Sequence, residues 1–104
     1  MIRGNNYKPL PIGLTIGDSD IHGLGLISTT DIQESTRLGT THVFHKETNK
    51  WIRTPLGGFI NHSDEPNCFI LNDKDGRRVL FTVKPIRKNE ELCVFYSLKE
   101  WTNI

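Results

Sequence analysis

The sequence predicts a mostly β protein built from short strands. Short apolar runs recur along the chain of 104 residues and are separated by turn-forming residues. The dipeptide Asp75-Gly76 supplies the positive-φ turn chemistry of a β-hairpin. Apolar residues at helical spacing are nowhere sustained over about twelve positions. Together these observations favour a strand-rich domain over a helical one.

The expected strands can be placed in chain order. Leu14-Thr15-Ile16 is a brief extended run, and Gly23 to Ser28 is a second one that contains glycine. Cys68 to Leu71 and Val79 to Val83 flank the segment "NDKDGRR" and form the expected hairpin. Leu92 to Tyr96 is a last apolar strand, too rich in aromatic and β-branched residues for a helix.

Two polar segments of the chain resemble each other. The segments "DIQESTRL" (31–38) and "PIRKNEEL" (85–92) each place an isoleucine six residues before a leucine. Each follows a strand-like run and precedes another, as expected of a bulging connection around a compact β core. Two copies are too few for a solenoid, and coincidence in a small β protein is an equal alternative.

Composition narrows the classes of function. The formal net charge is +1 and 36% of the residues are hydrophobic, so we expect one folded domain. The short basic group Lys84, Arg87 and Lys88 is more simply a solvated turn than a nucleic-acid patch. No apolar run approaches the roughly 20 residues of a membrane span, and the N-terminus lacks the apolar region of a signal peptide. We therefore expect a cytoplasmic protein that binds neither membranes nor nucleic acids directly.

The segment around Asn61-His62-Ser63 admits several chemistries. It matches the N-x-S glycosylation acceptor, but such matches are frequent by chance and have no meaning without a secretory route. His62 with Ser63 or Cys68 could form a nucleophile and base, but no orienting third group or oxyanion hole has a signature here. Cys68 and Cys93 are expected to be reduced core thiols.

Two further patterns are weak when taken alone. His42 and His45 stand three apart, but zinc sites usually draw on four ligands, so surface or half-buried histidines of a β-hairpin are favoured. We therefore expect no metal site. Gly23 and Gly25 form a lone G-x-G, which fits a bulge or a tight backbone crossing as well as a ligand loop.

Three motifs are more specific together, in their order along the chain, than each is alone. They are "HGLGL" at 22–26, "GFINHSDEPNC" at 58–68 and "NEELCVFY" at 89–96. In this order they resemble the SET-domain family, which contains the S-adenosylmethionine-dependent protein lysine methyltransferases. The likeness is greatest to compact SET proteins encoded by some viruses and bacteria, so a viral protein would act inside the host cell. We expect residues 1–104 to be a single SET domain, with a core at about 14–101 and an N-terminal extension at 1–13.

The resemblance implies a SET-domain, β-clip-like fold of short strands in several small sheets. It also implies that the C-terminal segment is threaded under the N-H-S loop, which would bring Asn61 and Tyr96 together. Pro66 would stiffen that loop, and the Asn67 side chain would bond to the backbone it bends around.

The resemblance further implies that the cofactor is S-adenosylmethionine and that the substrate is a protein lysine, of a histone or another protein. The Asn61 side chain would hold the cofactor's amino group, and the His62 backbone would read the adenine edge. Tyr96 would be catalytic, with its hydroxyl beside the transferring methyl. The residues implied to bind the cofactor are His22, Gly23, Leu24, Gly25, Asn61, His62 and Tyr96. The residues implied to line the substrate channel are Phe59, Val94, Phe95 and Trp101.

Departures from the family pattern leave a second hypothesis open. Gly58 stands where many members have arginine, and Asp64 stands where many have a zinc-binding cysteine. The segment between Leu38 and Asn61, which usually holds a helical insert, is short. The alternative is a non-catalytic SET-like module that binds a peptide or protein and retains the cofactor. The resemblance leaves the cofactor and lysine pockets without a closing segment, so either Leu98 and Trp101 fold back over them or a second subunit covers them in a homodimer.

Overall fold

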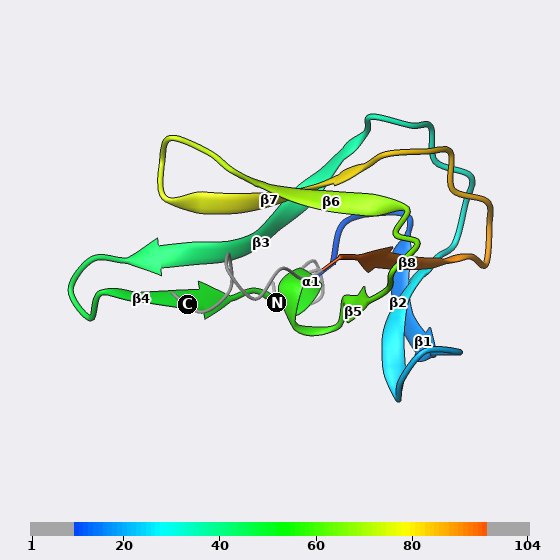
Figure 1. The fold of residues 1–104 in the computed structure, drawn as a ribbon, viewed down its shortest axis with the longest axis horizontal. Helices are drawn as coiled ribbons and strands as arrows, with labels where there is room; N and C mark the ends of the chain where they lie inside the picture. Colours follow the sequence, from blue (N-terminus) through cyan, green and yellow to red (C-terminus); the bar gives the residue numbers. More distant parts are fainter. Residues whose placement is uncertain (1–9, 96–104) are drawn as a thin grey trace, which may run out of the picture.

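The computed structural model describes residues 10–95. Within this range the chain forms two four-stranded β-sheets and one short helix, joined by loops (Figure 1). One sheet has the strand order β1-β2-β8-β5, and the other has the order β4-β3-β7-β6. The elements are β1 (Leu14–Asp18), β2 (Leu24–Ser28), β3 (Arg37–His45), β4 (Lys50–Arg53), α1 (Pro55–Gly58), β5 (Asn61–His62), β6 (Cys68–Asn72), β7 (Arg77–Thr82) and β8 (Glu91–Val94). The prediction of a mostly β fold in several small sheets is confirmed.

The strands expected from the sequence are present with small shifts at their ends. β1 begins at Leu14, and β2 begins one residue after Gly23. β6 and β7 form the predicted hairpin, and Gly76 in its turn has a φ of 77°. β8 ends at Val94, so Phe95 lies beyond the strand.

The segment between Leu38 and Asn61 holds a hairpin and a single helical turn. β3 and β4 pair antiparallel, and the hairpin that they form extends to the left end of the molecule in Figure 1. The hydroxyl of Thr54 accepts a hydrogen bond from the backbone N–H of Gly57 at 3.3 Å and so caps α1. Pro55 begins the helix, where its missing N–H removes no helical bond.

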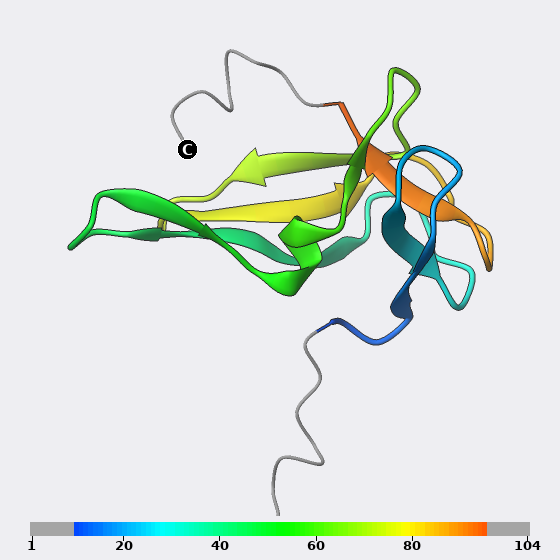
Figure 2. The same ribbon diagram turned by 90° about the horizontal axis from the view of Figure 1, so that it is seen from below.

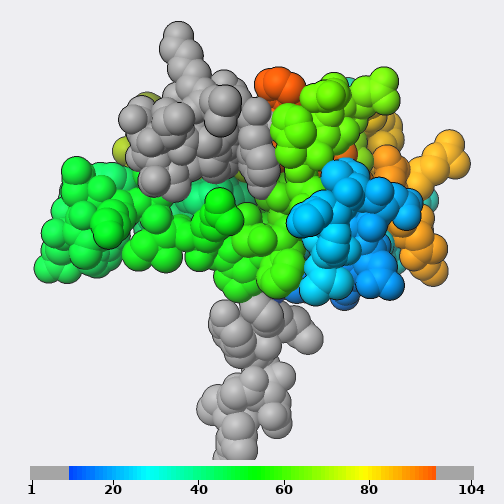
Figure 3. Space-filling view, turned by 60° about the horizontal axis from the view of Figure 1, so that its bottom comes forward, coloured from blue at the N-terminus to red at the C-terminus, as the bar shows by residue number. Residues whose placement is uncertain are grey.

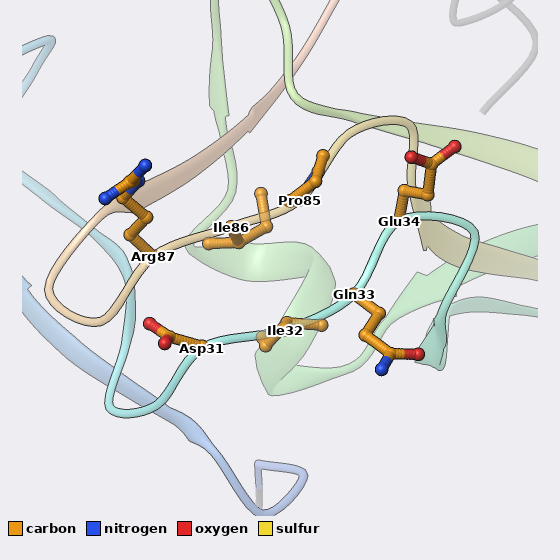
Figure 4. Close-up of a pocket in the computed structure, with 7 residues that line it drawn as sticks. All are labelled: Asp31, Ile32, Gln33, Glu34, Pro85, Ile86 and Arg87. Atoms are coloured by element: carbon orange, nitrogen blue, oxygen red, sulfur yellow. The ribbon is translucent and has the colours of Figure 1, made fainter.

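The two similar polar segments lie side by side and share one backbone arrangement. Ile32 and Ile86 form an antiparallel bridge in which each N–H donates to the other's carbonyl at 2.8 Å. Three residues later, Ser35 and Asn89 have positive φ angles of 60° and 72°. Figure 4 shows the two segments side by side, with residues of both lining one hollow.

The hydrogen bonds around this bridge reveal a structural repeat. The N–H of Ser28 donates to the carbonyl of Glu90 at 2.9 Å, and the N–H of Thr82 donates to the carbonyl of Thr36 at 3.0 Å. Each atom of the second bond lies 54 positions from its counterpart in the first. The two copies span residues 13–40 and 67–94. The likeness of the polar segments in sequence therefore extends to their backbone arrangement.

A single apolar core joins the two sheets. Leu26, Leu56, Leu80, Ile86 and Leu92 are almost completely buried in it. Burying one such side chain contributes about 1.5–3 kcal/mol, so this cluster holds the sheets against each other. Figure 2 shows the two sheets and the turn of α1 beside them. No helix within residues 10–95 is long and apolar enough to cross a membrane.

β8 occupies an inner position of the first sheet and fixes the place of the N-H-S motif. It pairs antiparallel with β2, where Leu26 lies opposite Leu92. On its other side it pairs parallel with β5, where Asn61 lies opposite Cys93 and His62 lies opposite Val94. The threading that we expect for the C-terminal segment lies mostly outside the described residues.

Candidate functional site

The side-chain amide of Asn61 is the point where the three sequence motifs meet. Its Nδ2 lies 3.1 Å from the carbonyl oxygens of both His22 and Leu24, in the G-x-G motif. It also lies 2.9 Å from Oε2 of Glu91, in the third motif, and 3.1 Å from Oγ of Ser19. In Figure 3 the blue β1–β2 hairpin, the lime-green segment after β5 and the orange-red end of β8 adjoin on one face.

These neighbours determine which way the Asn61 amide faces. Carbonyl and carboxylate oxygens accept hydrogen bonds and do not donate them, so the group that faces them must be the NH₂. Within residues 10–95 no hydrogen bond is made to Oδ1 of Asn61. Oδ1 is therefore the acceptor that this side chain can offer to a ligand.

Ser19 and Glu91 complete the cluster, and neither was among the predicted site residues. The Ser19 hydroxyl lies 2.8 Å from both carboxylate oxygens of Glu91. Its oxygen also accepts the backbone N–H groups of Ile21 at 2.8 Å and His22 at 3.1 Å. The β1–β2 turn is thereby tied to β8. Glu91 could have been found from the sequence, because it lies inside the third motif. Ser19 lies outside all three motifs, so no motif pointed to it.

The two glycines of the G-x-G motif have different surroundings. A Cβ at Gly25 would overlap Oε2 of Glu91 and would lie 3.0 Å from Nδ2 of Asn61. Gly23 has a φ of 51°, and a Cβ there would have no atom within 4 Å. Among the described residues, the space beside Gly25 is therefore filled by the protein's own side chains, while the side of Gly23 is open.

His62 presents its imidazole to the segment that follows it. Its Nε2 lies 3.2 Å from Oδ1 of Asp64, and its ring centroid lies 5.0 Å from that of Phe95. The backbone continues the pairing with β8, because the N–H of Ser63 donates to the carbonyl of Val94 at 2.9 Å. The contact of the His62 backbone with adenine stays a prediction.

The Asn67 side chain bonds to β8, and the expectation that it bonds within its own loop is wrong. Its Nδ2 donates to the carbonyl of Glu91 at 2.8 Å, and its Oδ1 accepts the N–H of Cys93 at 2.9 Å. A third bond runs from Nδ2 to Oε2 of Glu90 at 3.2 Å. Asn67 is buried beside the strand, so its amide takes the place of a strand neighbour.

The predicted channel residues are only partly together. Val94 and Phe95 line a hollow of about 290 Å³ along β6. Phe59 packs against the apolar core, and Trp101 and Tyr96 lie outside the described residues. A larger hollow of about 770 Å³ lies between the repeated segments (Figure 4), and no predicted site residue lines it.

His42 and His45 do not form a pair. They lie three positions apart on β3, so their side chains leave opposite faces of the strand. The expectation that His42 is at least half exposed is wrong, because it is almost fully buried on the sheet face that carries Arg78. Burial, followed by the nearby charges of Arg78 and Arg53, lowers the pKa of His42 to about 4. No group of three metal-binding side chains occurs in the described part of the chain.

The two cysteines are free and buried, as predicted. Burial raises the pKa of the Cys68 thiol to about 12, and the neighbouring Cys93 and Glu90 add to the shift. Cys68 is therefore an inert core thiol and not a nucleophile at neutral pH.

Comparison with known sequences gives one family. The family model described as "SET domain" matches residues 41–97. A Caenorhabditis elegans protein named "Probable histone-lysine N-methyltransferase set-23" is 40% identical over 50 residues. The match covers 44% of this chain and 20% of that protein, so the chain corresponds to a fifth of its length.

Comparison with solved structures gives the same fold. The methyltransferase domain of human PR domain-containing protein 2 superposes with a TM-score of 0.66 at 19% identity, covering 85% of this chain and 79% of that one. A candidate histone methyltransferase of Plasmodium falciparum gives a TM-score of 0.68 at 21% identity, covering 82% and 93%. A chain of the Chaetomium thermophilum Polycomb Repressive Complex 2 gives 0.69 at 17% identity, covering 85% and 16%.

Proposed function

Because this chain belongs to the SET-domain family, we propose that it is an S-adenosylmethionine-dependent methyltransferase that acts on a lysine side chain of a protein. The observation that carries the proposal is the meeting of the three motifs at the Asn61 amide. The relatives named as histone-lysine or histone methyltransferases support this reaction class. A histone is one candidate substrate, but no contact in the described residues selects it.

The Asn61 cluster suits the amino end of S-adenosylmethionine. An ammonium group donates hydrogen bonds, and Oδ1 of Asn61 is an acceptor without a partner among the described residues. The carboxylate of Glu91 accepts a charge-assisted hydrogen bond from Nδ2 of the same amide at 2.9 Å. The open side of Gly23 leaves space for a ligand beside the turn. The bound cofactor supplies a methyl group on a positively charged sulfur.

The protein has to align the lysine amine and strip water from it. The hollow beside Val94 and Phe95 is lined mainly by apolar residues of β6, as such a channel requires. We place it in the lysine channel together with Phe59 and Trp101. Tyr96 follows β8 by two positions and is the proposed source of the hydroxyl beside the reacting amine.

Transfer of a labelled methyl group from S-adenosylmethionine to a protein mixture tests the activity. Asn61→Ala should weaken cofactor binding, and Tyr96→Phe should reduce transfer with little loss of binding. Gln33→Ala, which removes an exposed amide outside the cluster, is the control and should change neither. Unchanged turnover in the Tyr96 variant would contradict its role. Cofactor binding without any transfer would instead identify a non-catalytic module.

Three finer parts of the proposal concern organisation and origin. A single domain with its core at about 14–101 is supported by β1, which begins at Leu14. A homodimer that covers the site predicts twice the chain mass in solution, and a monomer mass at working concentration would exclude it. The likeness to compact viral and bacterial members stays a prediction.

A further inference from the structure

The carboxylate of Glu91 is held by hydrogen-bond donors alone. Its two oxygens bond to the hydroxyl of Ser19, and Oε2 also accepts from the amide of Asn61. Within residues 10–95, no lysine, arginine or histidine forms an ion pair with it. A partly buried carboxylate without a cationic partner loses hydration that a cation does not replace. The burial of the Glu91 carboxylate is therefore poorly explained by a contribution to the stability of the fold.

The arrangement does have a clear effect on Asn61. A flipped amide would point Oδ1 at the carboxylate and at the carbonyls of His22 and Leu24, which all repel it. The bond to Glu91 is charge-assisted, and such bonds are roughly twice as strong as neutral ones. Glu91 thus contributes the largest single preference for the orientation in which Oδ1 is left for a ligand.

Ser19 connects this orientation to the G-x-G turn. The Ser19 hydroxyl donates a hydrogen bond to the carboxylate of Glu91, and its oxygen accepts hydrogen bonds from the backbone N–H groups of Ile21 and His22. The turn that supplies two of the carbonyls around Asn61 is therefore fixed by the same carboxylate. The Ser19 oxygen and the Glu91 carboxylate both contact the same atom, Nδ2 of Asn61.

We propose that Glu91 is a positioning residue for the cofactor's amino group. It acts through Asn61: it holds Nδ2 and thereby presents Oδ1 to the ammonium, with Ser19 keeping the turn in register. This inference rests on the proposed function, because it assumes that the amino end of the cofactor lies at Asn61.

Two probes separate this role from general support of the fold. S-adenosylhomocysteine carries the amino acid end, and 5′-methylthioadenosine lacks it. Glu91→Gln should weaken binding of S-adenosylhomocysteine about tenfold, the effect of losing one charge-assisted bond, and should leave 5′-methylthioadenosine binding unchanged. The matched control is Glu90→Gln, since Glu90 also bonds an asparagine amide, that of Asn67. It should leave the affinity for both probes unchanged.

A double-mutant cycle tests whether Glu91 acts through Asn61. Asn61→Ala combined with Glu91→Gln should bind S-adenosylhomocysteine no more weakly than Asn61→Ala alone. Additive losses would overturn the proposal, and so would an equal loss for both probes, which would indicate a structural role. Circular dichroism and thermal melting check that each variant is folded. Ser19→Ala, which leaves the carboxylate in place, is the substitute if Glu91→Gln does not fold, and it should also weaken S-adenosylhomocysteine selectively.

A nuclear magnetic resonance measurement on the free protein separates failure of this inference from failure of the function. The two side-chain N–H protons of Asn61 should exchange slowly and differ widely in chemical shift in the parent protein and in Glu90→Gln. Glu91→Gln should speed the exchange and narrow the difference in chemical shift, although the carbonyls of His22 and Leu24 still accept from the amide. If the parent protein binds neither probe, the proposed function fails. The resonance measurement still decides whether Glu91 orients Asn61, because it needs no ligand. Unchanged Asn61 signals in Glu91→Gln would overturn the positioning role.

Discussion

Replacing Gly25 by alanine tests the geometry of the Asn61 cluster. Gly25 does not need a left-handed backbone, so an alanine is excluded only by what its Cβ would meet. That Cβ would overlap Oε2 of Glu91 and would lie 3.0 Å from Nδ2 of Asn61. The carboxylate would have to leave its present place, and the bonds to Ser19 and Asn61 would be lost with it.

The size of the effect follows from those bonds. Hydrogen bonds to a charged group contribute about 1.5–3 kcal/mol each, and water regains part of that by solvating the displaced carboxylate. We therefore expect Gly25→Ala to lower the free energy of unfolding by about 2–4 kcal/mol. Gly23→Ala is the matched comparison, because only its positive φ opposes the change, at a cost of about 1 kcal/mol.

Urea denaturation of both variants measures the two free energies. The same Gly25→Ala change in a Glu91→Ala background should cost much less, because the overlapping carboxylate is gone. A Gly25→Ala variant as stable as the parent, or a cost of Gly25→Ala that is unchanged in the Glu91→Ala background, would contradict the overlap with the carboxylate.

Three further predictions concern buried polar groups. Asn61→Asp would place an oxygen 2.9 Å from Oε2 of Glu91. Thermal melting should therefore show a large loss of stability at pH 7 and a partial recovery in acid, where one of the two carboxyl groups is protonated. An unchanged melting temperature would contradict the hydrogen bond between Asn61 and Glu91. The pKa of His42 is lowered to about 4, so the folded state keeps it neutral while the unfolded state binds a proton below about 6.5. The free energy of unfolding should therefore fall by about 2.5 kcal/mol as the pH drops from 6.5 to 4, and urea denaturation of His42→Gln should lack this part of the pH dependence. Cys68, with a pKa raised to about 12, should react with iodoacetamide only after unfolding, and rapid alkylation of the folded protein would contradict its burial.

Local chemistry made much of the fold predictable. The Asp75-Gly76 turn depends on neighbouring residues alone, and the hairpin of β6 and β7 formed as expected. The three motifs were readable because each is a short, continuous segment. The β3–β4 hairpin gave a weaker signal, since its turn near Asn49 lacks glycine and uses a non-glycine residue at a φ of 59°.

The partners of the site residues could not be predicted, because they depend on pairing between distant segments. Glu91 meets Asn61 only because β8 lies between β2 and β5, which no local pattern encodes. The same pairing turns the Asn67 amide toward β8 and away from its own loop. His42 is buried because β3 lies inside the second sheet, between β4 and β7, a position that its sequence does not reveal.

A calorimetric titration of the protein with S-adenosylmethionine measures whether the Asn61 cluster belongs to a cofactor site. We expect saturable heat at one site per chain and a rise in the melting temperature of the parent protein, both diminished by Asn61→Ala. The absence of both heat and thermal stabilisation in the parent protein would contradict a cofactor site at Asn61.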